Sequence, residues 1–193
     1  NALVHYKIAF QDSPDPLVRA AAKWGEARIY FAEENYKETL IAIQTLITEY
    51  PSSAHLGQAY FIRGLSLYRL GDFQAAADSW QTYLTLRPGY LDSYTQELRG
   101  DALFTAGNYA EALPSYKASI QAGHLGDATL LDIKIASTYA KLGDPVSSLA
   151  LYDGLFAPPT NDYIKAQTLY EAGMVNQEND QVEQAQTKLR LAV

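Results

Sequence analysis

The chain of 193 residues contains no cysteine, a single methionine and only three histidines. The absence of cysteine excludes disulfides, cysteine-based metal sites and a thiol nucleophile. His5, His55 and His124 lie far apart, and none belongs to a metal-ligand pair at helical spacing such as HExxH. We therefore expect no metal site and no catalytic histidine.

Charged residues are also few. They make up 19% of the chain, and the formal net charge is −7. Nucleic-acid binding requires clustered Lys and Arg that contact phosphates, so this balance argues against a nucleic-acid partner. No apolar run approaches the roughly 20 residues of a membrane span, so the sequence predicts no direct membrane insertion.

Motifs of catalysis and cofactor binding are missing as well. The sequence contains no GxGxxG, no GxxxxGK[ST] and no GxSxG. The acidic residues at 33–34 and 178–183 fall at expected helix ends, where carboxylates are solvated or face the helix dipole. The sequence therefore predicts a non-catalytic chain without a cofactor, and any catalytic domain would lie outside it.

What the sequence does contain is an internal repeat. The segments LGDFQAAADSW, AGNYAEALPSY and LGDPVSSLALY each have Gly, then Asp or Asn, then a small residue, then an aromatic residue. Extending the pattern outward aligns six small-residue positions, separated by steps of 36 or 37 residues, at Ala2, Thr39, Ala76, Ala112, Ser148 and Ala185. A fixed period of this length indicates a stacked-repeat protein.

The pattern resembles that of the tetratricopeptide repeat (TPR) family: a bulky residue, Gly or Ala, and Tyr, then Ala, an aromatic residue and Pro. The second repeat carries it nearly whole, with Tyr60, Gly64, Leu67, Ala76, Trp80 and Pro88. The resemblance covers essentially the whole chain. It implies an all-α fold, a right-handed superhelical α-solenoid of antiparallel helix pairs, with about eleven helices.

Small residues are expected to set the distance between the two helices of a pair. Glycine at 64, 100 and 173 on first helices, and alanine at 76, 112 and 185 on second helices, would let the helix backbones approach closely. Large residues such as Trp80 would fill the space that remains.

We expect one repeat array with a truncated start. Residues 1–16 would be the second helix of a first, incomplete repeat, followed by repeats at 17–53, 54–90, 91–126, 127–162 and 163–193. No polar capping helix follows the last repeat in this sequence. We therefore expect the natural protein to continue in both directions, and the uncovered ends of the fragment to allow weak end-to-end self-association.

Helix starts are predicted from capping patterns. A capping side chain stands three residues before a carboxylate at Asn35, Asn108 and Asp180, which is a variant of the capping box. The Asp-Pro pairs at Asp15 and Asp144 give a cap followed by proline at the first helical position.

TPR arrays bind ligands on the concave surface that their first helices form, so the resemblance implies a groove. Transferring the family's groove positions gives Trp24, Arg28, Phe31, Phe61, Leu65, Tyr68, Arg69, Tyr94, Asp101, Phe104, Ile133 and Tyr170. Seven of these are aromatic, more than a solvated surface needs. A one-residue error in register would exchange the two helix faces, so a place in the core remains the alternative for each.

Chaperone-binding TPR domains hold a C-terminal carboxylate with Lys and Asn on their first helices. The resemblance implies which positions of this chain correspond to those residues. Those positions carry Trp24, Arg28, Ile62, Tyr94 and Leu98 here. Only Arg28 could serve, so this clamp is not expected.

Two functions fit the sequence. The first is a protein-interaction scaffold that takes a peptide segment or a partner helix in its groove. The second is a structural superhelical arm of a larger bacterial cell-envelope enzyme such as a lytic transglycosylase. The Tyr-rich composition and phrases such as ITEYP at 47–51 resemble bacterial envelope TPR proteins, which favours the cell envelope or periplasm over the cytoplasm.

Overall fold

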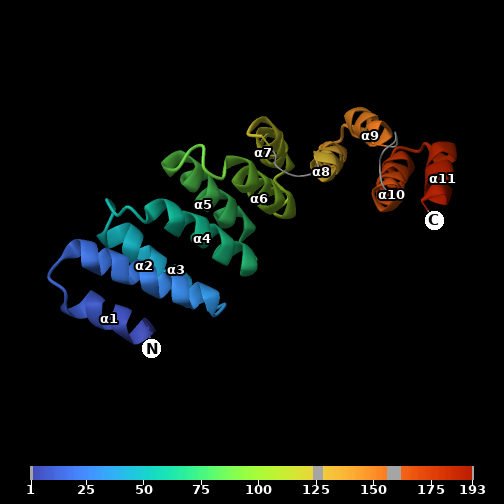
Figure 1. Ribbon diagram of the computed structural model, residues 1–193. Helices are drawn as coiled ribbons and strands as arrows, with labels where there is room; N and C mark the ends of the chain where they lie inside the picture. The colour runs from blue at the N-terminus through green and yellow to red at the C-terminus, as the bar shows by residue number, and fades with distance from the viewer. Residues whose placement is uncertain (1, 124–127, 156–161, 193) are drawn as a thin grey trace. The chain divides into compact units, whose positions relative to one another are not determined.

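A computed structural model describes residues 2–123, 128–155 and 162–192, and His124 lies outside these ranges. Within them the chain forms eleven α-helices and no strand, so the all-α prediction is confirmed (Figure 1). Among these helices none combines the length and the apolar composition needed to cross a membrane.

The chain divides into two compact units, Asn1–Ala106 and Gly107–Val193. In unit 1 each helix packs against the next one along the chain, as a series of hairpins with short connections (Figure 1). Its helices are α1 (Ala2–Asp12), α2 (Pro16–Ala32), α3 (Tyr36–Glu49), α4 (Leu56–Arg69), α5 (Phe73–Leu86) and α6 (Asp92–Thr105).

The core of unit 1 uses small residues where helices meet and large ones between them. One cluster joins α2, α3 and the start of α4 through Ala20, Ala27, Ala42, Ile43, Leu46 and Ala59. A second centre is Trp80 of α5, which is 0% exposed, and its indole Nε1 donates to the Phe61 carbonyl of α4 at 3.2 Å. Burial of this apolar area is the main stabilising contribution to such a unit.

Close helix approach is confirmed at Gly64 and Gly173, two of the three glycines predicted to allow it. A Cβ placed on Gly64 would lie 2.4 Å from Trp80 Nε1, and one on Gly173 would lie 2.8 Å from the Leu189 side chain. Gly25, which the repeat pattern does not single out, makes a third such contact, because its Cβ would lie 2.5 Å from the Tyr6 ring of α1. Glycine is required at these points because no other residue leaves room for the facing ring or side chain.

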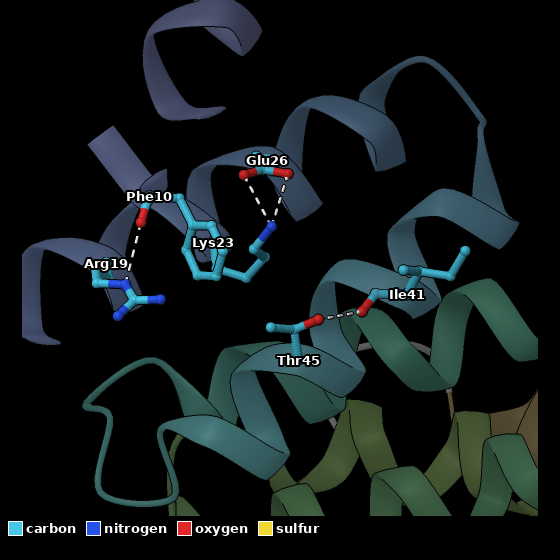
Figure 2. A network of polar contacts seen from close by, with 6 residues as sticks. All are labelled: Phe10, Arg19, Lys23, Glu26, Ile41 and Thr45. Carbon is cyan, nitrogen blue, oxygen red and sulfur yellow. Dashed lines mark hydrogen bonds and ion pairs between the residues drawn. The ribbon is translucent and has the colours of Figure 1, made fainter. Parts of the chain in front are cut away.

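Cation–aromatic contacts fix the α1–α2 joint (Figure 2). The Phe10 ring lies between Arg19 and Lys23, with Arg19 Cζ 5.0 Å and Lys23 Nζ 3.9 Å from its centroid. Arg19 Nε also donates to the Phe10 carbonyl at 3.1 Å. Lys23 pairs with the buried carboxylate of Glu26 at 3.0 Å, so both cations are engaged within this joint.

Unit 2 contains α7 (Tyr109–Gln121), α8 (Ala128–Lys141), α9 (Pro145–Gly154), α10 (Asp162–Glu178) and α11 (Val182–Leu191). Its described helices also pack in chain order. A core cluster joins α8, α9 and α10 through Ile133, Ala136, Tyr152, Ile164, Ala172 and Val175. Lys188 of α11 donates to Asp153 of α9 at 2.8 Å and connects the two second helices.

The predicted helix starts are confirmed at Asp15, Asp144, Asn35 and Asn108, which are all N-cap residues, but only the two aspartates accept a cap hydrogen bond. Asp15 accepts from the Leu17 N–H at 2.8 Å and Asp144 from the Ser147 N–H at 3.0 Å, each before a proline at the helix start. Asn35 and Asn108 occupy N-cap positions, yet their amides donate to glutamate side chains instead of accepting from the backbone. Unlike a carboxylate, an amide can donate, and here a nearby glutamate takes that bond.

The third capping-box prediction, at Asp180, is wrong. The N-cap of α11 is Gln181, while Asp180 precedes it with a left-handed backbone, φ 59°. The Asn176 amide donates to the Gln181 side chain across this turn. Asparagine and aspartate tolerate left-handed backbone better than most residues, which suits Asp180 to the turn rather than the cap.

Replacing Asp144 by alanine should destabilise unit 2 in a pH-dependent way. Hydrogen bonds from the side chain and the backbone N–H of Ser147 lower the pKa of Asp144. A lowered pKa contributes stability that is present above the ordinary carboxylate value and is lost as pH falls through the lowered one. The Tm difference between wild type and Asp144→Ala should therefore shrink from about pH 5 to about pH 2. A difference that stays constant over this range would contradict the role of the charged cap.

Candidate partner-binding surface

The candidate residues of unit 1 come from three first helices, α2, α4 and α6, and we call them together the first-helix surface. Helices α2 and α4 contact each other. The Trp24 ring of α2 stacks on His55, which precedes α4, with centroids 5.8 Å apart and an interplanar angle of 15°. His55 is a contact that sequence analysis missed, because nothing in the repeat pattern marks it. The surface consists of Trp24, Arg28, Phe31, Phe61, Leu65, Tyr68, Arg69, Tyr94, Asp101 and Phe104.

An aromatic cluster continues this surface from α4 to α6. The Phe61 ring packs against Tyr83 of α5 at 5.2 Å and against Tyr94 of α6 at 6.3 Å between centroids. Burial raises the pKa of Tyr83, which lies behind Phe61 in the core. Tyr94 is on the open side of the cluster, and 53% of it is exposed. The Phe61 ring thus lies between the buried Tyr83 and the exposed Tyr94 and packs against both.

Other candidate residues of the first-helix surface are only partly exposed. Tyr68 is half-buried, and its ring packs on Phe73 at 5.1 Å and on Trp80 at 6.0 Å. Phe31 is also half-buried and meets Tyr36 edge to face at 5.9 Å. These rings contribute to helix packing as well as to the surface. Leu65, Asp101 and Phe104 are half-buried too.

The connection between α5 and α6 adds exposed apolar side chains that sequence analysis did not select. Tyr90 is 72% exposed, and Leu86 and Leu91 are exposed beside it. Arg87 lies over the Tyr90 ring, with Cζ 4.9 Å from the centroid, and its Nη1 donates to the Gln58 side chain of α4 at 2.7 Å. The sequence does contain a signal for these exposed apolar side chains. The connection after α5 reads RPGYL at 87–91, whereas the equivalent connection after α3 reads YPSSAH at 50–55, which is more polar.

The two candidates in unit 2 differ. Ile133 is only 5% exposed and belongs to the core cluster of α8, α9 and α10, so its assignment to the groove is wrong. It is covered because the buried Tyr152 of α9 and the helix α10 pack around it. Tyr170 of α10 is exposed.

Polar contacts accompany the core of unit 2. The Ser137 and Tyr152 hydroxyl oxygens are 2.7 Å apart, and burial raises the pKa of Tyr152 to about 12. Burial also raises the pKa of Glu171, with Lys141 opposing the shift. The hydroxyl pair joins α8 to α9.

The repeated helix pairs match a known protein family. A family model described as "Tetratricopeptide repeat" matches residues 61–127 and, in an overlapping match, residues 97–162. Together the matches cover more than half of the chain. The chain belongs to the tetratricopeptide repeat family. The match includes Gly64, Leu67, Ala76, Trp80 and Pro88 of the second repeat, on which the resemblance was based.

Solved TPR structures share the fold at low sequence identity. YrrB, described as "a TPR protein with an unusual peptide-binding site", is 17% identical, with a TM-score of 0.71 over 100% of this chain and 92% of YrrB. A crystal structure of MamA protein is 12% identical, with a TM-score of 0.70 over 90% of this chain and 89% of MamA. MamA from Desulfovibrio magneticus RS-1 is 16% identical, with a TM-score of 0.68 over 90% and 92%. No curated protein sequence matches.

The described helices of this TPR chain present extended surfaces. In the described ranges no group of three or more His, Asp or Glu side chains is placed to hold a metal ion. A depression of about 300 Å³ on α11 is lined by Glu183, Gln184, Thr187 and Lys188, all from one helix, so no second element converges on it. TPR repeats are in general interaction scaffolds, which use the extended surface formed by stacked helices.

Proposed function

We propose that the chain is a non-catalytic scaffold that binds an extended peptide or a partner helix on the first-helix surface of unit 1. The observation that carries this proposal is the presence of partly exposed aromatic side chains on all three first helices, with ring contacts between neighbouring repeats at two places. Trp24 reaches the start of α4 through His55, and Phe61 reaches α6 through Tyr94. Partly exposed aromatic rings on a rigid scaffold supply contact area at low cost in conformational entropy.

Tyr94 is the residue that tests this proposal most directly. It is exposed, so its replacement by alanine should change the free energy of unfolding by at most about 0.5 kcal/mol. Peptides selected on the wild-type protein from a random twelve-residue phage library should bind Tyr94→Ala about tenfold more weakly. Phe61 and Tyr68 are less suitable, because both pack on core rings and their replacement would lower stability as well.

Tyr163 of α10 provides a matched control. It is also an exposed tyrosine on a first helix, but it lies in unit 2 and outside the first-helix surface. Tyr163→Ala should leave the affinity of the selected peptides unchanged. Equal losses in the two variants, or no loss in Tyr94→Ala, would show that the peptides do not use the proposed surface.

Two earlier expectations stay predictions. One is the role of a structural arm in a cell-envelope enzyme. End-to-end self-association would use the apolar side chains exposed on α1 and α11, such as Val4, Ile8, Val182 and Leu191. Light scattering over a concentration series tests it directly.

A further inference from the structure

The charge of unit 1 is distributed unevenly between its first and second helices. Helices α2 and α4 carry five Lys and Arg against one Glu, a formal net charge of +4. Their partners in the same hairpins, α3 and α5, carry one Lys against three Asp and Glu, a net charge of −2. The whole chain has a net charge of −7. Positive charge is therefore concentrated on α2 and α4, two of the three helices that form the first-helix surface.

Three of the five cations on α2 and α4 already have partners. Lys23 pairs with Glu26, and Arg19 donates to the Phe10 carbonyl (Figure 2). Arg63 donates to the Ser79 hydroxyl at 2.7 Å, against α5. Lys23 is thus neutralised by a carboxylate, and the guanidinium groups of Arg19 and Arg63 are held against neighbouring parts of the chain.

Arg28 and Arg69 are different. Both are exposed, and neither makes a hydrogen bond or an ion pair in the part of the chain that the structure describes. Arg28 lies one turn from Trp24 and from Phe31 on α2. Arg69 lies one turn from Leu65 on α4, beside Tyr68. Each arginine is thus a free cation at the margin of partly exposed aromatic or apolar side chains.

An arginine guanidinium binds a carboxylate through two parallel N–H···O bonds, and a neighbouring aromatic ring strengthens such contacts by excluding water. The charge changes sign at the next first helix, because α6 carries three Asp and Glu against one Arg. A carboxylate-bearing ligand is therefore favoured over α2 and α4 and disfavoured over α6.

We propose that the first-helix surface takes an acidic peptide segment, with Asp or Glu side chains paired to Arg28 and Arg69 and apolar side chains on the aromatic rings between them. This inference rests on the proposed function and names the chemistry of its ligand. The carboxylates come from side chains within the segment, and a C-terminal carboxylate is not needed.

The test is the sequence of the peptides that the wild-type protein selects from the phage library. The displayed peptides are fused to the coat protein at their C-terminus, so that only side chains can supply carboxylates. The enriched peptides should be acidic. They should bind Arg28→Gln/Arg69→Gln about three- to tenfold more weakly, with a difference that narrows at high salt. Synthetic copies with free and amidated C-termini should bind equally.

Lys37→Gln/Arg190→Gln is the matched control, because it makes the same change in net charge at two exposed cations on α3 and α11. Equal weakening by the control would overturn the proposal, since the effect would then belong to the overall charge. Enriched peptides that are neutral or basic, yet weakened by Tyr94→Ala, would also overturn it and leave the scaffold function standing. If no peptide depends on Tyr94, the proposed function fails, and this inference fails with it.

Discussion

Replacing Trp80 by alanine is expected to lower the free energy of unfolding by about 3–5 kcal/mol. The side chain is fully buried between α4 and α5, so its removal leaves a cavity that the surrounding helices fill only in part. The Phe61 carbonyl also loses the hydrogen bond from the indole. Chemical denaturation followed by circular dichroism measures the loss.

Trp24 is the comparison for this prediction. It is also a tryptophan of unit 1, but it is only half-buried, where it packs against the core cluster of α2 and α3 and stacks on His55. Trp24→Ala should therefore cost clearly less than Trp80→Ala. A similar loss for the two variants would mean that the α4–α5 contact is no more important to stability than the partly exposed surface.

Replacing Gly64 by alanine is expected to destabilise the protein by about 2–3 kcal/mol, although alanine is the better helix former. The added Cβ would lie 2.4 Å from Trp80 Nε1 and 2.6 Å from Cε2 of the same ring. The ring is buried and tied to the Phe61 carbonyl, so it cannot move aside easily. The overlap should force α4 and α5 apart or the indole out of its favoured rotamer.

The cause can be isolated by a double-mutant cycle. In the Trp80→Ala background the overlap is gone, so Gly64→Ala should become neutral or stabilising by up to about 1 kcal/mol. Gly154→Ala, at the end of α9, supplies a control for helix propensity, because a Cβ there meets nothing within 4 Å. An equal penalty for Gly64→Ala in both backgrounds would contradict a steric origin.

Charge placement shows how sequence and structure contribute differently to the site. The sequence contains every arginine and lysine, but it does not show which of them other parts of the chain engage. Only the contacts reveal that Arg19, Lys23 and Arg63 are engaged while Arg28 and Arg69 are exposed. The ligand chemistry proposed here therefore depends on tertiary contacts that the repeat pattern does not contain.

The sequence by itself determined the fold class, through a repeat pattern that resembles the TPR family, and several positions of close helix contact. Ala76 and Ala112 are fully buried, and so are the aromatic residues four positions later, Trp80 and Tyr116. The reason is local: residues four apart share a helix face, and the small residue sets how near the paired helix can lie. A single sequence read at a fixed period contains this information.

Exposure at the equivalent groove positions was decided only by the tertiary structure. Trp24, Phe61, Ile133 and Tyr170 occupy the same place in four repeats, at multiples of the repeat period. Yet Trp24 and Phe61 are half-buried, Ile133 is in the core and Tyr170 is 52% exposed. Helical register fixes the direction of a side chain, but its burial depends on the side chains that neighbouring helices bring against it. Those neighbours are His55 for Trp24, Tyr83 and Tyr94 for Phe61, and the α9–α10 cluster for Ile133, and no period along the chain specifies them.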